Sequence, residues 1–239
     1  NCQGVANNDT NISLHRFIYV HKPKFLGIAE PKKVYDPSFA GLENRGYKFI
    51  GRNSTIGRTD SLWVFAHDSI CHVTSLNVYD QILTCEADIT NAHFYCSFVY
   101  AKNTYQERRT LWQTIEAANL RIHDPWILLG DFNDILCPSE CLGAVHQTLS
   151  SREYKAFMDG NNMVEINLVG AKYTWYRRHR NRMVARKLDR AFSNGQALKT
   201  WDSISSITLS RINSDHHPIM VSFVIGASKP RFPFRFNSA

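Results

Sequence analysis

Hydrophobic residues fall into many short runs along this chain, separated by polar and turn residues. Most runs are no longer than one strand, and several alternate apolar with polar side chains, as half-buried strands do. We predict strands at 24–29, 47–50, 62–66, 70–78, 82–88, 93–101, 126–130, 173–177, 186–192, 204–209 and 218–225.

Three segments instead place apolar side chains three and four residues apart, the spacing of a helix that buries one face. Two have these positions at residues 14, 17 and 18 and at 111, 112, 115 and 118. In the third, Ser150 and Glu153 form a capping box, and Gly160 can end the helix. Many strands with interspersed helices and no repeat indicate one α/β domain whose sheets are covered by helices.

Composition narrows the class of protein. The 239 residues are 44% hydrophobic, enough for a core, and their net charge of +7 favours a polyanionic partner such as nucleic acid. No apolar run could span a bilayer and no signal peptide begins the chain, so we expect no membrane partner and no secretion. The six cysteines form neither a CxxC pair nor a cluster with histidine. We therefore expect reduced thiols in a nuclear or cytoplasmic protein.

One predicted strand is followed directly by side chains that could be catalytic. The stretch WILLGDFND, residues 126–134, presents Asp131 and Asn133 directly after an apolar run and a glycine. A turn is the simpler explanation, because Gly, Asp and Asn are common turn residues. A site at the carboxyl end of a strand, where α/β proteins place ligands, is the alternative. This stretch alone does not decide between them.

Other acids occupy similar positions. Glu30 follows the apolar run KFLGIA, Asp189 lies in the strand pattern ARKLDRAF, and Asp215 and His216 stand just before the strand at 218–225. Each has a simpler explanation. Glu30 could be a surface acid, and Asp189 could form an ion pair with Arg190. One histidine of the DHHP stretch is expected to be structural, and we predict that it is His217.

If these acids lie close together in the folded protein, they indicate a metal-binding site. Several carboxylates at one sheet edge would repel one another, and a divalent cation would remove that repulsion. Oxygen ligands suit Mg²⁺, with Mn²⁺ as a substitute. A carboxylate beside a histidine also fixes its tautomer and raises its basicity.

The most basic stretch follows the strand at 173–177. It contains no acid, and it reads as a hairpin with a cationic tip that could neutralise phosphates and reach a minor groove. A solvated loop or a localisation-like patch is the alternative. Trp175 at its start is predicted to be a core residue. The basic residues are Arg177, Arg178, Arg180, Arg182, Arg186 and Lys187.

Seven short motifs occur in an order that resembles that of a known protein family. NCQG, AEPK, VYAKN, LGDFND, YTWYRR, KLDRAF and SDHHPI follow one another along the chain. In this order the chain resembles the endonuclease/exonuclease/phosphatase superfamily and is similar within it to the apurinic-type endonuclease domain of plant LINE (non-LTR) retrotransposons. The resemblance implies a DNase I-like four-layer sandwich, two β-sheets packed face to face with helices outside. It covers residues 1–225, leaving 226–239 as a basic, proline-containing tail or linker.

The resemblance also implies roles for the acids. Glu30 would be the principal metal ligand, with Asn1 beside it and Asp215 as a further acid near the metal. Asp131 and Asn133 would position the attacking water and hold the scissile phosphate.

The remaining implied roles concern the phosphate. His216, oriented by Asp189, would contact it and act in acid–base catalysis or charge stabilisation. Tyr100 matches a phosphate-contacting tyrosine, and Asn103 matches a nearby polar position that contacts DNA.

The function implied is a Mg²⁺-dependent endonuclease that nicks double-stranded DNA and leaves a 3′-hydroxyl to prime reverse transcription. A reverse transcriptase domain would follow, and the domain itself would be a monomer. Two alternatives remain: a decayed remnant that binds nucleic acid without cleaving it, and a phosphatase of small phosphoesters. The family pattern starts with a strand leading into a Trp-Asn pair, whereas this chain opens on Asn1 and has Gln3 where arginine is usual. By comparison with that pattern the first strand is truncated, and we expect a sheet with one strand fewer.

Overall fold

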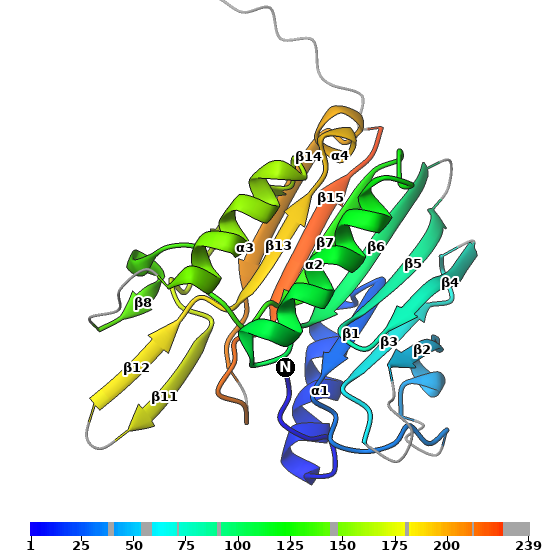
Figure 1. Cartoon of the computed structure of the whole chain (residues 1–239). Helices are drawn as coiled ribbons and strands as arrows, with labels where there is room; N and C mark the ends of the chain where they lie inside the picture. Colours follow the sequence, from blue (N-terminus) through cyan, green and yellow to red (C-terminus); the bar gives the residue numbers. More distant parts are fainter. Residues whose placement is uncertain are drawn as a thin grey trace, which may run out of the picture.

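The computed structural model describes residues 1–37, 41–53, 59–70, 72–89, 92–143, 148–179, 182–211 and 213–226 (Figure 1). Its helices are α1 (Asn8–His21), α2 (Tyr105–Asn119), α3 (Leu149–Gly160) and α4 (Gly195–Thr200), with 3-10 turns η1 (Glu43–Arg45) and η2 (Pro138–Glu140). Its strands are β1 (Phe25–Ala29), β2 (Tyr47–Asn53), β3 (Leu62–His67), β4 (His72–Tyr79), β5 (Ile82–Ile89), β6 (Ala92–Tyr100), β7 (Trp126–Asp131), β8 (Cys141–Leu142), β9 (Val164–Glu165), β10 (Leu168–Val169), β11 (Trp175–His179), β12 (Arg182–Arg186), β13 (Asp189–Ser193), β14 (Ser203–Thr208) and β15 (Ile219–Val224).

The main sheet has the strand order β4-β5-β6-β7-β13-β9. Its inner face packs against β1-β3-β2 and β10-β14-β15, and one apolar cluster joins side chains of all three sheets. Helices α2 and α3 cover its outer face, while α1 packs outside β3 (Figure 1). The predicted sandwich with outer helices is confirmed. Within the described ranges β1 and β15 are end strands of separate sheets.

The glycine of WILLGDFND has a steric role. Gly130 adopts φ +143°, and a Cβ there would lie 2.0 Å from the carbonyl oxygen of Val99 on the neighbouring strand. Only glycine allows β6 and β7 to stay paired up to their ends. The glycine thereby sets the position of Asp131, the next residue along.

The strand predicted at 186–192 is wrong in its extent. The chain leaves the hairpin at Arg186, breaks at residues 187 and 188, and starts β13 at Asp189 in a different sheet. The Thr174 hydroxyl accepts the backbone N–H groups of Leu188 and Asp189 at 2.9 and 2.8 Å, so it satisfies the donors freed by the break.

The predicted capping box is also wrong. Helix α3 begins two residues earlier than Ser150 implied, and Thr148 caps it by accepting the backbone N–H of Ser151 at 3.0 Å. The Ser150 hydroxyl instead donates to Asp134, and Glu153 pairs with Arg109 of α2. Threonine caps nearly as readily as serine, so the tertiary contacts of Ser150 decide which residue starts the helix.

The structure also bears on the predictions about the cysteines, membrane spans and the C-terminal tail. Cys85, Cys96 and Cys141 are buried free thiols. In the parts of the chain that are described, none of the helices has both the length and the apolar character needed to cross a membrane. Residues 227–239 lie outside the described residues, so the domain boundary after 225 stays a prediction.

A fully buried arginine joins the main sheet to the segment after β7. Arg190 on β13 makes a two-pronged ion pair with Glu140 of η2, and it also contacts Glu165 at 2.7 Å. Burial raises the pKa of Glu140, but the hydrogen bond and charge of Arg190 outweigh it and lower that pKa below 4.5. Glu140 therefore contributes stability above pH 4.5, and the contribution disappears as pH falls through its lowered pKa.

We predict that Glu140→Gln lowers the free energy of unfolding by about 3 kcal/mol at pH 7, because a buried guanidinium loses its main counter-charge. The melting temperature should fall by roughly 6–12 °C. The difference from wild type should shrink below pH 4.5. Glu153→Gln weakens a partly exposed pair with Arg109 and a side-chain hydrogen bond with Tyr105, and it should change stability by less than about 1 kcal/mol. Equal melting shifts in the two variants would contradict the argument.

Candidate active site

Strand register builds the centre of the site. Tyr100 of β6 lies opposite Asp131 of the parallel β7, and Asp189 of the antiparallel β13 lies opposite Asp131 on its other side. Residues directly opposite each other project from the same face of a sheet. The register alone therefore places a tyrosine and two carboxylates in one row at the end of three central strands.

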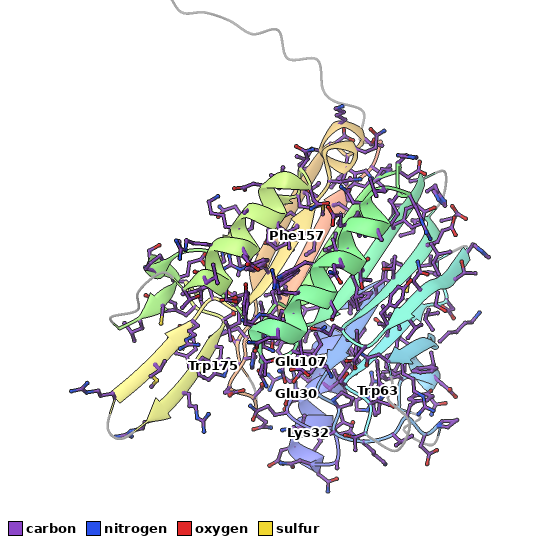
Figure 2. All side chains as sticks on the ribbon, in the orientation of Figure 1. Glu30, Lys32, Trp63, Glu107, Phe157 and Trp175 are labelled. Carbon is purple, nitrogen blue, oxygen red and sulfur yellow. The ribbon has the colours of Figure 1, made fainter. Side chains whose placement is uncertain are left out.

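Glu30 joins this row from the other sheet. It directly follows β1, and its Oε1 accepts hydrogen bonds from the Tyr100 hydroxyl at 2.5 Å and from Asn1 Nδ2 at 3.1 Å. The same Asn1 amide lies 3.3 Å from Asp131 Oδ2. Lys32 is 3.3 Å from the other Glu30 oxygen, and both residues lie at the same end of the sandwich in Figure 2. Asn1 thus bridges the carboxylates of the two sheets.

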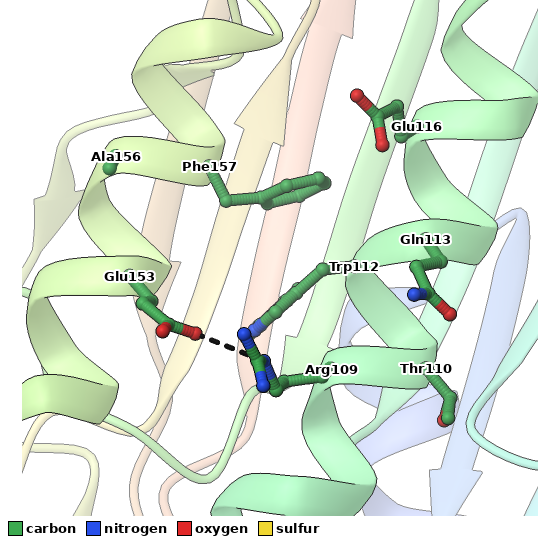
Figure 3. A pocket seen from close by; sticks show the side chains of 8 residues that line it. All are labelled: Arg109, Thr110, Trp112, Gln113, Glu116, Glu153, Ala156 and Phe157. Atoms are coloured by element: carbon green, nitrogen blue, oxygen red, sulfur yellow. Dashed lines mark ion pairs between the residues drawn. The ribbon is translucent and has the colours of Figure 1, made fainter.

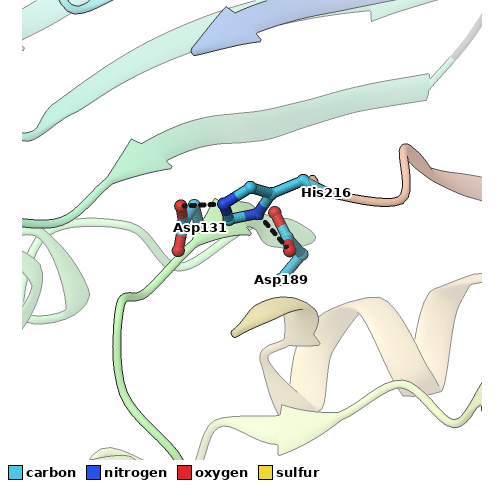
Figure 4. A group of neighbouring side chains, drawn as sticks. All are labelled: Asp131, Asp189 and His216. Carbon is cyan, nitrogen blue, oxygen red and sulfur yellow. Dashed lines mark hydrogen bonds and ion pairs between the residues drawn. The ribbon is translucent and has the colours of Figure 1, made fainter. Parts of the chain in front are cut away.

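His216 completes the cluster from the loop before β15. Its Nδ1 is 2.9 Å from Asp189 Oδ2, and its Nε2 is 3.8 Å from Asp131 Oδ2, so the ring lies between two carboxylates (Figure 4). All three side chains are nearly fully buried. The neighbouring His217 instead meets the carbonyl oxygen of Leu209 at 2.8 Å, as predicted for the structural member of the pair.

Asp215 lies at the rim of the cluster. One carboxylate oxygen accepts a hydrogen bond from Gln3 Nε2 at 2.5 Å, and the other accepts one from the Trp175 indole at 2.8 Å. The first oxygen is also 3.9 Å from His216 Nε2. Trp175 is half-buried rather than a pure core residue, and it connects the base of the hairpin to the site.

The other two predicted asparagines have different surroundings. Asn133 donates to the carbonyl oxygen of Ala101 at 2.6 Å, and its backbone N–H donates to Asp131 Oδ1 at 2.9 Å. Asn103 is exposed on the segment that follows β6. Both therefore belong to adjacent segments at the rim of the carboxylate cluster.

Burial and charge shift the pKa values in this cluster. Burial, then repulsion by Asp189, raises the pKa of Asp131 to about 6. Burial lowers the pKa of His216, but attraction to Asp189 and the hydrogen bond between them outweigh it and raise that pKa overall. Burial raises the pKa of Asp189, but His216 outweighs it and lowers that pKa overall. The pair of Asp189 and His216 thus favours a carboxylate facing an imidazolium.

The same reasoning applies at Glu30. Burial raises its pKa, but hydrogen bonds from Tyr100, Asn1 and Lys32 together lower it below 4.5. Burial, followed by the hydrogen bond to Glu30, raises the pKa of Tyr100. At neutral pH the site holds an ionised Glu30 beside a neutral tyrosine that donates to it, and the carboxylate can accept a cation.

Backbone strain gathers at the same place. Gln3, Glu30, Lys32 and Asn133 have φ values of +53°, +49°, +53° and +51°. Such values are uncommon for residues other than glycine and concentrate at functional sites. Glu30 is itself one of the carboxylates described above, and each of the other three residues forms a hydrogen bond or an ion pair with one of them.

A family model for the endonuclease/exonuclease/phosphatase family matches residues 1–216. The chain belongs to this family. Membership confirms the predicted resemblance and makes the chain an enzyme of the metal-dependent nuclease and phosphoesterase class. No curated protein matches it in sequence.

Solved structures of similar fold support the family assignment. The endonuclease domain of TRAS1, a telomere-specific non-LTR retrotransposon, has a TM-score of 0.70 at 14% identity, with 93% of this chain and 95% of that chain covered. The 3′-5′ exonuclease NExo from Neisseria meningitidis gives 0.68 at 17%, covering 94% and 97%. An AP endonuclease from Archaeoglobus fulgidus gives 0.67 at 13%, covering 93% and 96%. At these identities the likeness shows the fold alone.

The donor set fits the divalent cation that this family uses. Asp131, Asp189 and His216 have ligand atoms within 4.8 Å of one another, but Asp189 is engaged with the protonated His216. The ionised Glu30, whose side chain is 23% exposed, can reach an ion from solvent. Oxygen donors with room for water are the ligands that Mg²⁺ prefers. The family's metal would therefore be held at the Glu30 side of the cluster.

The basic hairpin formed by β11 and β12 projects from the site (Figure 1). Arg177, Arg178, Arg182 and Arg186 are exposed on it, and Arg186 lies over the Trp175 ring. Lys187 differs, because its ammonium pairs with Glu165 at 2.8 Å and is mostly buried. The exposed arginines are therefore better placed than Lys187 to meet DNA, and the predicted DNA contacts stay a prediction. Arg180 lies outside the described residues.

Three residues around the site were not predicted. Gln3 and Trp175 hold Asp215, and Ser214 donates to the carbonyl oxygen of Asn1 and accepts the backbone N–H of His216. Ser214 thus holds the first and last motifs of this family member together. Its place directly before the DHHP stretch was the only signal, and the contact with Asn1 crosses nearly the whole chain.

Proposed function

We propose that the chain is a Mg²⁺-dependent endonuclease that nicks double-stranded DNA. The observation that carries this proposal is the unbroken set of contacts from Glu30 through Asn1 to Asp131, His216 and Asp189. These residues come from five segments, yet they share one end of the sandwich. Two buried carboxylates and a partly exposed one beside a histidine are the groups that metal-assisted phosphodiester hydrolysis needs.

Each residue has a role in the proposed reaction. Asp131, with its pKa near 6, is ionised at neutral pH and can orient a water or take its proton. His216 and Asn133 can donate hydrogen bonds to the phosphate oxygens, and Tyr100 could do so once its hydroxyl turns away from Glu30. Asp189 holds His216 charged and in one orientation. A bound divalent cation would add Lewis-acid stabilisation of the charge that develops on the phosphate.

A LINE-type element is the proposed source of the domain. The motifs of the sequence and the TRAS1 endonuclease fold support this assignment. In such an element the 3′-hydroxyl left by the nick would prime a reverse transcriptase encoded after this domain, and cleavage would take place in the nucleus. We propose that the domain acts as a monomer.

Supercoiled plasmid tests the proposal. With Mg²⁺ the chain should convert supercoiled to open-circular DNA, and EDTA should stop the conversion. Retarded plasmid without nicking would instead support a non-cleaving DNA-binding remnant. Release of phosphate from a small phosphoester without plasmid nicking would support a phosphatase of the same family. Either result would refute the proposed activity.

The hairpin should contribute to DNA affinity. Arg177 and Arg182 are exposed on its two strands, and Trp175 at its base touches the site. We predict that Arg177→Ala combined with Arg182→Ala weakens binding to all sequences alike. The slope of log K against log salt should become shallower by about 0.9 for each phosphate that the two arginines no longer neutralise.

Binding titrations in EDTA across a salt series measure this slope. The matched control is Arg152→Ala, which removes an exposed arginine from α3 and should leave the slope unchanged. An equal change in the control would contradict a specific role of the hairpin.

A further inference from the structure

Two chain segments form the rim of the site. Residues 100–103 start at the last residue of β6 and carry Tyr100 and Asn103, whereas residues 131–134 start at the last residue of β7 and carry Asp131 and Asn133. They are joined to each other by two hydrogen bonds, from Ala101 N to the carbonyl oxygen of Asp131 at 2.8 Å and from Asn133 Nδ2 to the carbonyl oxygen of Ala101 at 2.6 Å. The proposed reaction requires both segments at fixed positions.

One buried side chain reaches both segments from behind. Arg108, in the first turn of α2, donates through Nη1 to the carbonyl oxygens of Lys102 and Asn103 at 3.0 and 2.8 Å. Through Nη2 it donates to Asp134 Oδ2 at 3.0 Å and to Ser150 of α3 at 2.7 Å. Its side chain is 6% exposed and that of Asp134 is 10% exposed. The guanidinium therefore links two site segments and two helices.

The contacts of Asp134 extend this link. One of its oxygens accepts from Arg108 and from the Ser150 hydroxyl, and the other accepts the backbone N–H of Ile135 at 2.9 Å. These hydrogen bonds therefore fix the chain at Asp134, the residue directly after Asn133. A freely turning segment would not hold Asn133, at φ +51°, against Ala101.

Stability alone is a weak reason for this pair. Replacing a buried ion pair by apolar residues of similar volume often leaves a protein equally stable or more stable. A planar guanidinium has donors in a fixed fork, so it sets the angle between the groups it joins, which an ammonium cannot do. Arg108 donates to two carbonyl oxygens on one segment and to a carboxylate on the other. The fixed geometry of its donors therefore sets the angle between the two segments.

We propose that Arg108, acting through Asp134, is a positioning residue that sets the distance and angle between the Tyr100–Asn103 and Asp131–Asn133 segments. Its side chain would act through the groups it holds and not through contact with substrate or metal. The inference deepens the proposed function and rests on it, since the positions that Arg108 fixes are those that hold the phosphate and the attacking water.

The test compares Arg108→Lys with the same change at the next residue. Arg109 is 60% exposed and pairs with Glu153 across the groove between α2 and α3, whose lining contains none of the predicted site residues (Figure 3). Arg109→Lys is therefore the matched control. Asp134→Asn is a second variant that keeps the size of the carboxylate and removes its charge.

We expect Arg108→Lys and Asp134→Asn to lower kcat for plasmid nicking by about 10–100-fold, because misplacement of reacting groups by about 1 Å has an effect of that size. The Kd for plasmid in EDTA should stay within about twofold, because the hairpin is untouched. Simple loss of folded protein would lower binding capacity and kcat together. Arg109→Lys should leave both values unchanged.

Hydrogen exchange followed by mass spectrometry gives an answer that does not depend on activity. Amide exchange should become faster in peptides covering 100–103 and 131–135 in both variants, while α1 stays as protected as in wild type. If wild type does not nick, the proposed function fails and exchange alone decides the inference. If wild type nicks and the variants match it in kcat and in exchange, the inference fails while the proposed function stands. If a variant does not fold, the other variant decides.

Discussion

His216→Ala should lower the rate of plasmid nicking by about 10³–10⁴-fold while plasmid binding persists. Among the described histidines, His216 is the one whose ring pairs with both Asp131 and Asp189. In the proposed reaction it contacts the phosphate. Loss of a positioned acid or base, or of a preorganised charge, has effects of this size. The measurement is the single-turnover rate with supercoiled plasmid at saturating Mg²⁺.

The neighbouring histidine supplies the control. His217→Ala removes a ring of the same size one residue away, but its contact is with the carbonyl oxygen of Leu209 and not with the acids. We expect nicking within a few-fold of wild type below the melting temperature of the variant. Equal losses of rate in the two variants would mean that the DHHP stretch acts only through folding.

Glu30→Gln should reduce nicking by about 10²–10³-fold and raise the Mg²⁺ concentration needed for half-maximal rate by at least about tenfold. Glu30 combines a lowered pKa with a partly exposed edge, so among the clustered acids it is the group best able to hold a cation. An amide keeps the hydrogen bond from Tyr100 but loses the negative charge. A Mg²⁺ titration of the nicking rate separates these two effects.

Glu116→Gln is the matched control for that titration. Glu116 is exposed on α2, outside the cluster, and the substitution makes the same chemical change. The rate and the Mg²⁺ requirement should both equal those of wild type. A Glu30→Gln variant with a normal Mg²⁺ requirement but a lower rate would show that Glu30 acts on the phosphate rather than on the metal.

The acids of the site could be predicted from the sequence because each one interrupts or borders an apolar run. Their convergence could not be derived from those runs, because it depends on β7 lying between β6 and β13, an order that no local pattern encodes. One alternative could have been rejected from the pattern itself. Asp189 and Arg190 are consecutive in a strand and project from opposite faces, so they do not pair; Asp189 meets His216 and Arg190 meets Glu140.

The sequence does carry a signal for the buried position of Arg108. This arginine precedes Leu111 and Trp112 by three and four residues, so it lies on the apolar face of α2, where a charge has to have a partner. The two hydrogen bonds of Ser214 had no comparable signal, since serine before a turn is ordinary. The wrong cap at Ser150 has the same cause: its partner Asp134 is close only in the folded chain.

The most direct test of the account is a crystal structure of the chain with Mn²⁺ and a short DNA duplex, with the ion located by its anomalous scattering. We predict a peak at direct ligand distance from the Glu30 carboxylate, about 2.1 Å for the Mg²⁺ that Mn²⁺ replaces, with His216 facing the scissile phosphate. A peak that contacts none of Glu30, Asn1, Asp131 and Asp215, in a crystal whose DNA lies across this end of the sandwich, would contradict the account.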